Sequence, residues 1–291
     1  MFYSVLITDT QCALGAVIVK ELLESSFDVT ILSDDSGRWH EPDFTLAYLA
    51  KNAPNLVINN FGWSDNGNSL NLENHLAVAQ CLVDGCRNIG SPLIQLSNYR
   101  VFSGKKSGFI ESDEPVARDN IGEVYLNSEK IVEALDKHLI LRLGWVLGAS
   151  GTNLLTEIAS KFVAGDDAAI FSERRGSPVG HHDVARIILA LVKQISCGSE
   201  NWGTFHYSSS DACTEGEFAR EVLSELQSSF DLGTITANVV EMDSEPVSAA
   251  LGYKRLMDNF GIQPKMWRQS LSTELGLWVN HYQQHKTSCD Q

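Results

Sequence analysis

The sequence predicts an α/β protein with a Rossmann-like, doubly wound parallel sheet and a small C-terminal substrate lobe. Over the first 145 residues, short apolar runs rich in Val, Ile and Leu alternate with amphipathic stretches of helical period. This alternation is typical of βαβ units, whose parallel strands are covered by helices on both faces. A chain of 291 residues can bury a large core in such a domain and still form a smaller lobe.

Residues 1–150 are therefore expected to form a Rossmann-like domain of the dinucleotide-binding type. The expected strands are YSVLIT, FDVTILS, NLVINN, PLIQLS and LILRLGW. The helix-period stretches between them are ALGAVIVKELLES, FTLAYLAKN, NLENHLAVAQCLVDGCRNIG and NSEKIVEALDKH. A helical segment separates each strand from the next, as a parallel sheet requires.

Residues 151–291 are expected to form the smaller, substrate-binding-type lobe, partly interleaved with the first domain. HDVARIILALVKQI indicates a helix, GTFHYSS a short strand, and TEGEFAREVLSELQ a helix that a capping box from Thr214 to Glu217 opens. Trp145, Trp267 and Trp278 are expected to pack in the core or the lobe. We expect the lobe to lie over the carboxyl ends of the strands, where doubly wound folds bind ligands.

Composition excludes several classes of function. Lys and Arg number 22 against 37 Asp and Glu, so the formal charge of -15 opposes binding to nucleic acid or an anionic membrane. The six cysteines form no CxxC pair, which indicates reduced thiols rather than zinc ligands or a disulfide framework. No apolar run approaches the length of a membrane span and no basic signal flank precedes the first strand, so we expect a cytoplasmic protein. The run His181-His182-Asp183 lacks an evident third ligand, and no metal is predicted.

The first βα turn, from Thr8 to Gly15, departs from a dinucleotide-binding turn. Such a turn needs glycines because backbone N–H groups must approach the pyrophosphate closely. Only Gly15 of a G-x-x-G-x-x-G pattern is present, and Asp9 and Cys12 stand where the first two glycines would lie. Unless its side chain turns away, a carboxylate about 5 Å from a phosphate charge would repel it by roughly 3 kcal/mol.

Two acidic residues follow the second expected strand. Asp34 and Asp35 stand about twenty residues beyond the turn, where an acidic side chain can bind the ribose hydroxyls and favour NAD over NADP. Equally, the stretch Asp-Asp-Ser-Gly is typical of a solvated turn. The two interpretations remain open.

Several segments form a pattern along the chain: PNLVIN with Asn74 in the next helix, LSNYRVFSG, IESDEP, Tyr125, LRLGWVLG with Gly151 and Asn153, GSP with DVA, and WRQSL. Together they resemble the dTDP-4-dehydrorhamnose reductase family of extended short-chain dehydrogenases, which also includes the beta subunit of methionine adenosyltransferase. PNLVIN is similar to the family's P-D-x-V-I-N strand, Asn74 falls on an Asn of its next helix, and Tyr125 falls on the tyrosine of its Y-G-x-x-K helix. The likeness spans nearly the whole chain.

The resemblance implies an NAD or NADP cofactor, a nucleotide-sugar ligand and a catalytic trio of a hydroxyl residue, a tyrosine and a lysine. These three positions fall on Asn98, Tyr125 and Glu129. The implied cofactor-binding positions are Thr8, Asp9, Cys12, Leu14, Gly15, Asp34, Asp35 and Asn59. The implied substrate-binding positions are Arg100, Asn153, Arg174 and Arg175. The alternative interpretation is that the arginines pair with neighbouring carboxylates.

The reductase chemistry depends on a cation beside the tyrosine. A lysine four residues after Tyr125 would make the phenolate accessible near neutral pH and would hold the nicotinamide ribose, but that position is Glu129, which should repel a phenolate. Lys130 follows one place later and should face away, about 140° around the helix, unless a π-bulge shifts the register. Ser97 offers a hydroxyl beside Asn98, but strand alternation should turn it to the other face.

Three hypotheses follow. The first is a nucleotide-sugar-reductase-like protein whose cofactor and catalytic motifs are degraded. It would have a binding, regulatory or scaffolding role, exerted through a small-molecule ligand or a protein partner. The second is an active NAD(P)-dependent reductase of a dTDP-4-keto sugar or related carbonyl that uses Tyr125 as its acid. The third keeps the fold and uses Glu129 and Tyr125 for acid–base chemistry on another ligand.

Overall fold

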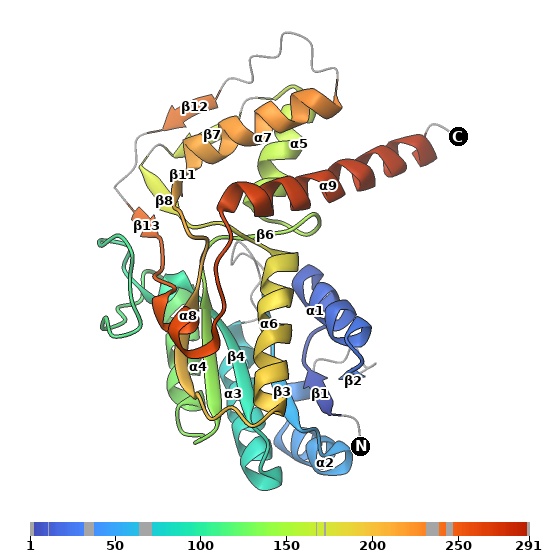
Figure 1. Cartoon of the computed structure of the whole chain (residues 1–291), viewed down its shortest axis with the longest axis vertical. Coiled ribbons are helices and arrows are strands. Elements are labelled where there is room, and N and C mark those ends of the chain that lie inside the picture. The colour runs from blue at the N-terminus through green and yellow to red at the C-terminus, as the bar shows by residue number, and fades with distance from the viewer. Residues whose placement is uncertain are drawn as a thin grey trace.

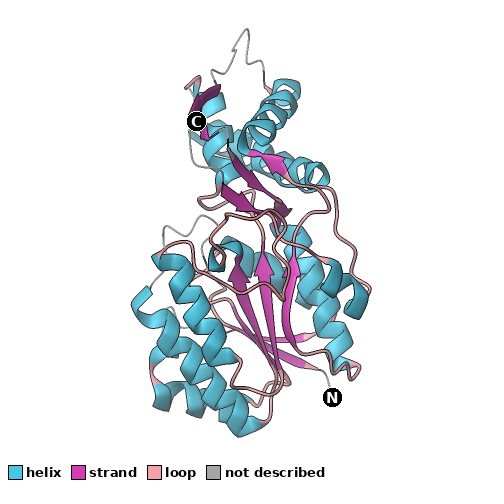
Figure 2. Ribbon diagram, turned by 90° about the vertical axis from the view of Figure 1, so that its left-hand side faces the viewer, coloured by secondary structure: helices cyan, strands magenta, loops and turns pink. Residues whose placement is uncertain are grey.

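The computed structural model describes residues 3–10, 12–31, 38–63, 72–166, 168–171, 173–230, 239–242 and 247–289. Figure 1 shows a sheet with its covering helices, and a smaller lobe of helices and short strands at one end of that sheet. In Figure 2 the strands of the sheet point toward the lobe, so the carboxyl ends of the strands face it. This is the end at which parallel α/β sheets bind ligands.

The central sheet is six-stranded and parallel, with the order β10-β5-β4-β3-β1-β2. Its strands are β1 (Ser4–Ile7), β2 (Asp28–Ile31), β3 (Leu56–Asn59), β4 (Leu93–Asn98), β5 (His138–Leu143) and β10 (Gly203–Tyr207). The strand order reverses between β1 and β3, and a crevice for ligands opens at such a point. The predicted fold class is confirmed.

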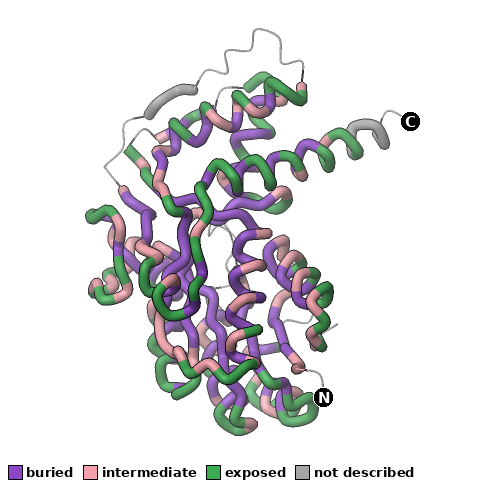
Figure 3. The backbone as a smooth tube through the Cα atoms, in the orientation of Figure 1, coloured by how far each residue is buried: buried purple, intermediate pink, exposed green. Residues whose placement is uncertain are grey.

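Helices cover both faces of the sheet. α1 (Ala13–Glu24) packs against α6 (His181–Ser196) on one face. The other face carries α2 (Pro42–Asn52), α3 (Leu72–Ile89) and α4 (Asn120–Val132), together with the short helix η1 (Arg38–His40). Alternate residues of β1 serve the two cores, because Val5 and Ile7 pack with α1 and α6 whereas Leu6 packs with α2 and α3. Figure 3 shows that burial follows the sheet and α6.

The smaller lobe has a core of its own, built from α5 (Leu154–Ala164), α7 (Glu215–Ser229) and α9 (Trp267–Cys289). Trp267 and Trp278 are buried in it, as predicted. The capping box from Thr214 to Glu217 opens α7, also as predicted. The short strands are β6 (Val146–Leu147), β7 (Ala168–Phe171), β8 (Arg174–Gly176), β9 (Val179–Gly180), β11 (Cys213–Thr214), β12 (Val239–Met242) and β13 (Val247–Ala249).

Two elements that the sequence analysis placed in the smaller lobe belong to the larger body. β10 pairs with β5 at the edge of the main sheet, and α6 packs against α1. α8 (Lys254–Phe260) also lies against β10. The sequence pattern reveals a helix and a strand but not the sheet that the strand joins, so their placement in the lobe was wrong. None of the helices described is long and apolar enough to cross a bilayer.

Candidate functional site

Several of the predicted site residues lie at the carboxyl ends of β1, β3 and β4. Thr8 follows β1, Asn59 ends β3 and Asn98 ends β4. Thr8 and Asn59 are hydrogen bonded, because the Thr8 hydroxyl donates to Asn59 Oδ1 at 3.0 Å and accepts from the Asn60 backbone N–H at 2.9 Å. These bonds tie β1 to β3 where the strand order reverses. Asp34 and Asp35 lie outside the described residues.

The Asp9 carboxylate turns into the first βα turn rather than away from it. Its Oδ1 accepts from the Cys12 N–H and its Oδ2 from the Gly62 N–H, each at 3.3 Å. Asp9 has φ of 43°, the left-handed conformation that a glycine would adopt most easily and that Asp tolerates. Backbone N–H groups that could meet a phosphate are thus already bonded to a carboxylate of the protein.

Cys12 caps the helix that a dinucleotide phosphate would approach. Its Sγ accepts from the Gly15 N–H at 3.3 Å and from Asn60 Nδ2 at 3.0 Å. Gly15 retains its packing role, since an added Cβ would lie 2.3 Å from the Asp9 carbonyl oxygen. Leu14 is buried in the core of α1, so its side chain has no ligand-facing position.

Tyr125 is a buried residue in the first half of α4, and its side chain is 1% exposed. Its ring meets His75 edge-on at 5.2 Å between centroids, and Trp63 at 6.2 Å. α4 is a regular α-helix from Asn120 to Val132, without a π-bulge, and Lys130 is exposed. The prediction that Lys130 faces away from the tyrosine is therefore confirmed.

Glu129 is neutralised by a cation that sequence reasoning missed. Its carboxylate accepts from Arg142 Nε at 3.0 Å and Nη2 at 2.6 Å, and from the Ser97 hydroxyl at 2.5 Å. The Arg142 and Glu129 side chains are only 5% and 1% exposed. Glu129 was expected to repel a phenolate at Tyr125, but β5 supplies Arg142 beneath α4, and this guanidinium compensates the charge of Glu129.

The ion pair extends into a buried network. Arg142 Nη1 lies 3.3 Å from His206 Nε2, and its guanidinium lies 5.0 Å from the centre of the Phe102 ring. Burial, aided by the Arg142 charge, lowers the pKa of His206 to about 3. His206 is thus neutral, and it accepts from Arg142 while Nδ1 donates to the Phe109 carbonyl at 3.2 Å.

The strand ending at Asn98 separates the two neighbouring polar side chains. Ser97 reaches Glu129 on α4, whereas Asn98 Oδ1 accepts from the Arg100 N–H at 2.9 Å and caps η2 (Tyr99–Val101). Ser97 therefore does not stand in for the missing hydroxyl residue beside Asn98. The alternation of side chains along a strand accounts for this separation.

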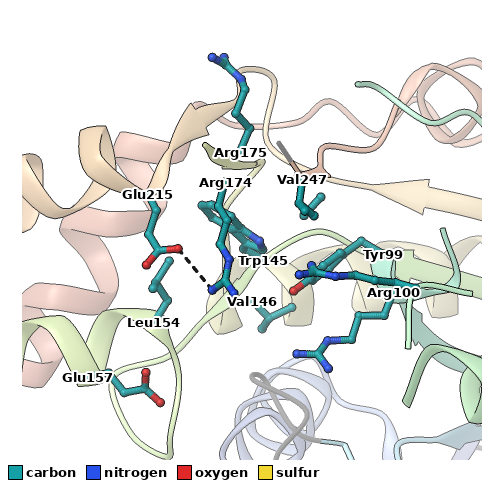
Figure 4. Close-up of a pocket in the computed structure, with 12 residues that line it drawn as sticks. Tyr99, Arg100, Trp145, Val146, Leu154, Glu157, Arg174, Arg175, Glu215 and Val247 are labelled. Atoms are coloured by element: carbon teal, nitrogen blue, oxygen red, sulfur yellow. Dashed lines mark ion pairs between the residues drawn. The ribbon is translucent and has the colours of Figure 1, made fainter. Parts of the chain in front are cut away.

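A pocket of about 270 Å³ lies between the sheet and the smaller lobe. It is lined by Tyr99, Arg100, Arg118, Trp145, Val146, Leu154, Glu157, Arg174, Arg175, Glu215, Val247 and Ala249. Four guanidinium residues against two carboxylates make this lining cationic within an acidic protein. Trp145, which was expected to pack in the core or the lobe, packs against the core of the smaller lobe and is also one of the pocket walls, as Figure 4 shows.

The pocket arginines differ in their surroundings. Arg174 Nη1 lies 3.8 Å from Glu215, and its guanidinium stacks 3.7 Å from the centre of the Phe171 ring. Burial raises the pKa of Glu215, against the opposing charge of Arg174. Arg175 points away from the other labelled side chains (Figure 4), because successive residues of β8 face opposite sides. Arg174 and Arg175 are thus not arranged as a joint clamp.

Two further predicted residues have structural partners. Arg100 pairs with Asp119 at 3.2 Å while lining the pocket, which agrees with the salt-bridge interpretation. Asn153 caps α5: Oδ1 accepts from the N–H groups of Leu155 and Thr156, and Nδ2 donates to two carbonyls. An amide has four such positions, so Asn153 has none left for a ligand. Its expected substrate contact is corrected to a capping role.

The histidine run forms the first turn of α6 and makes structural contacts. His182 Nδ1 lies 2.9 Å from Glu274 of α9, and the bond to Glu274 raises the pKa of His182. Asp183 pairs with Arg186 and accepts from the Tyr207 hydroxyl. Across the described ranges, no group of three His, Cys, Asp or Glu side chains could hold a metal.

Sequence reasoning missed Arg142, Arg118 and Glu215. One signal was available for Arg142, because it interrupts the apolar strand LILRLGW and a buried charge requires a partner. Nothing in the local sequence indicates that Arg118 and Glu215 meet the same pocket. They come from a loop before α4 and from the start of α7.

The parallel sheet, the reversal of its strand order between β1 and β3 and a tyrosine on α4 define a protein of the Rossmann-type, extended short-chain reductase class. The family model described as "RmlD substrate binding domain" matches residues 3–277, and the chain belongs to that family. It is a dTDP-4-dehydrorhamnose-reductase-like protein, and the family predicted from the sequence is confirmed.

Two curated relatives match almost the full length. The spore coat polysaccharide biosynthesis protein SpsK of Bacillus subtilis is 22% identical over 297 residues, covering 98% of this chain and 99% of that protein. A dTDP-4-dehydrorhamnose reductase of Aggregatibacter actinomycetemcomitans is 22% identical over 282 residues, covering 91% and 96%.

Solved structures agree in fold. A dTDP-4-dehydrorhamnose reductase of Bacillus anthracis in complex with NADP superposes with a TM-score of 0.82 at 19% identity, over 94% of this chain and 98% of that one. The Bordetella bronchiseptica enzyme WbmG, in complex with NAD and UDP, gives 0.80 at 13% identity over 96% and 95%. At these identities the likeness shows the shared fold.

Proposed function

We propose that this protein is a nucleotide-sugar-binding homologue of the reductases that has lost the reduction chemistry and serves a binding or regulatory role. The observation that carries the proposal is the position of Asp9. Its carboxylate accepts from the Cys12 and Gly62 N–H groups, so a pyrophosphate would have to displace a bonded anion of like charge. That displacement disfavours NAD and NADP, both of which the family fold would otherwise accept.

The catalytic positions support the same conclusion. Both oxygens of Glu129 are engaged by Arg142, and Ser97 bonds one of them, so no lysine-like cation faces the nicotinamide ribose from this position. The engagement also opposes the hypothesis that Glu129 acts as an acid or base, because a free carboxylate is needed to exchange protons. A homologue of this kind would act through its ligand or through a protein partner.

The cationic pocket supports the proposal that the protein still binds a nucleotide sugar. Arg100 and Arg174 line it beside the aromatic side chains of Tyr99 and Trp145. Guanidinium groups bind the oxygens of a diphosphate, and aromatic rings stack on a base. In a protein with a formal charge of -15, the guanidinium groups of Arg100 and Arg174 at this pocket favour an anionic ligand such as a nucleotide sugar.

The rival function is an active NAD(P)-dependent reductase of a dTDP-4-keto sugar with Tyr125 as acid. Its support is the buried tyrosine on α4 together with the NADP bound by the Bacillus anthracis relative. In that case, the enzyme would have to bind its cofactor in a way that tolerates Asp9. It would also need a cation from another position, because position 129 is not a lysine.

Titration of the protein with NADH and NADPH, followed by nicotinamide fluorescence, separates the two functions. The wild type is expected to give no saturable signal, whereas Asp9→Gly is expected to bind detectably because it frees the turn and removes the charge. Asp9→Asn keeps a side chain in the turn without the charge, and it serves as the matched control that separates repulsion from occupancy. Micromolar binding by the wild type, with turnover of a dTDP-4-keto sugar, would refute the proposal.

A further inference from the structure

Glu274 is a carboxylate buried between the larger body and the smaller lobe. It lies on α9 and is 1% exposed. Its Oε1 accepts from the His182 backbone N–H at 3.0 Å and lies 2.9 Å from His182 Nδ1, and its Oε2 accepts from the Ala149 N–H at 3.2 Å. One side chain of the lobe thus holds both the start of α6 and the segment that follows β6.

The carboxylate caps α6 from a different helix. The N-cap residue of α6 is Gly180, which has no side chain to accept from the first N–H groups of the helix. Glu274 takes this role, because it accepts from the N–H of His182, the second residue of α6. Gly180 also leaves the necessary space, since a Cβ there would lie 2.8 Å from Glu274 Oε1. Both elements are therefore shaped for this contact.

The charge of Glu274 is compensated by a group that can lose its own charge. No lysine or arginine among the described residues forms an ion pair with Glu274, whose partner is the 42% exposed side chain of His182. The buried Glu129, in contrast, pairs with Arg142, which stays charged at every physiological pH. The contact of Glu274 is therefore sensitive to pH in a range where that of Glu129 is not.

The other charges that face His182 come from α1. The hydrogen bond to Glu274 is the largest cause that moves the pKa of His182, and it raises it; burial and Lys20 oppose the rise, and Glu21 supports it. The bond therefore contributes fully below the pKa of an unfolded histidine, about 6.5, and weakens as the pH rises through the folded pKa. Mild acid strengthens the contact and mild alkali weakens it.

The contact is connected to the cationic pocket through the segment that contains Ala149. Residues 148–152 join β6 to Asn153, which caps α5. Leu154 and Glu157, in the first turn of α5, are walls of the pocket. A change in the hold on Ala149 therefore acts on this wall.

We propose that His182 and Glu274 form a proton-controlled latch that holds the smaller lobe on the larger body and thereby sets the wall of the cationic pocket. The latch is tight when His182 is protonated. It loosens when His182 is neutral, because the buried carboxylate then keeps hydrogen bonds but no counterion. Control of ligand affinity by the latch rests on the proposed function, whereas the latch itself does not.

Hydrogen–deuterium exchange tests the latch without a ligand. Protection of the peptide that contains Ala149, corrected for the intrinsic effect of pH on exchange, is expected to be about threefold higher at pH 5.5 than at about pH 8.5. His182→Gln cannot titrate, so its protection is expected to be the same at both pH values. His281→Gln is the matched control: it replaces an exposed histidine of α9 and should keep the wild-type difference. Equal protection of the wild type at the two pH values, or a difference that survives in His182→Gln, would overturn the latch.

Calorimetric titration with dTDP-glucose tests the control of the pocket. The diphosphate of this compound is esterified at both ends and keeps the same charge at the two pH values. The wild type is expected to bind about threefold more tightly at the lower pH, and His182→Gln equally at both. A wild-type affinity that does not change with pH would overturn the link between the latch and the pocket. Failure of the wild type to bind at either pH would overturn the proposed function, and the exchange measurement would still decide the latch.

Discussion

The buried pair of Glu129 and Arg142 makes a quantitative prediction about stability. Replacing either residue by methionine leaves its partner as a charge buried without a counterion, since the side chains are 1% and 5% exposed. Replacing both removes the two charges together and fills the space with apolar atoms. The three variants form a double-mutant cycle that isolates the interaction.

The expected magnitude follows from burial and distance. Opposite charges about 4 Å apart attract by about 4 kcal/mol at an effective dielectric near 20, and breaking a buried pair typically costs about 3–5 kcal/mol. We therefore expect Glu129→Met and Arg142→Met each to lower the free energy of unfolding by about 3–5 kcal/mol. The double variant should lie within about 2 kcal/mol of the wild type, because Ser97 and His206 still lose a partner.

Guanidinium chloride unfolding followed by circular dichroism gives these free energies. The exposed pair Lys254–Asp258 is the matched control: it has a similar separation of 2.7 Å, but its side chains are 80% and 50% exposed. The same cycle on that pair is expected to give a coupling below about 0.5 kcal/mol. Additive effects of the two methionine substitutions at the buried pair would refute the reasoning.

The same pair bears on any attempt to restore the reductase lysine. Glu129→Lys would place an ammonium beside the Arg142 guanidinium, so the single substitution should destabilise the protein by at least about 3 kcal/mol. Adding Arg142→Met should recover much of that loss. A lysine at position 129 is thus expected to need a second substitution at Arg142. The free energies of unfolding of the single and double variants measure this requirement.

Two further predictions concern the pocket and the contact of the C-terminal helix. Arg174→Gln should weaken dTDP binding about tenfold, whereas Arg175→Gln should have little effect, because only the Arg174 guanidinium faces the pocket interior. Calorimetry that shows an equal loss of dTDP affinity for the two variants would contradict this. The raised pKa of His182 means that its bond to Glu274 contributes stability fully below about pH 6.5 and loses it as pH rises through the folded pKa. Thermal unfolding should therefore show a loss of stability as the pH rises above about 6.5, under about 1 kcal/mol, that His182→Gln lacks. An unchanged slope would exclude the bond as its source.

Much of the fold could be predicted from the local sequence pattern, because strands and helices follow from the spacing of apolar residues along the chain. The strands of the first half form where apolar runs predict them, and α7 begins at its capping box. The site was predictable only in part. Tyr125 is buried on α4, and its role as a site residue stays a prediction, whereas the outward position of Lys130 follows from helical geometry. Asn153 was misassigned because a capping asparagine and a ligand-binding asparagine look alike in sequence.

The sequence by itself determined the parallel α/β class, the family resemblance and the departures at Asp9, Cys12 and Glu129. These depend on residue identity and on spacing along the chain. Only the tertiary structure decided what the departures do: the Asp9 carboxylate bonds to the Gly62 N–H, Glu129 meets Arg142 from β5, and β10 joins the main sheet. Each of these contacts joins segments far apart in the chain, and hydrogen bonds and charges act over a few ångströms of space. Their partners are therefore fixed by packing and are not visible in the local sequence.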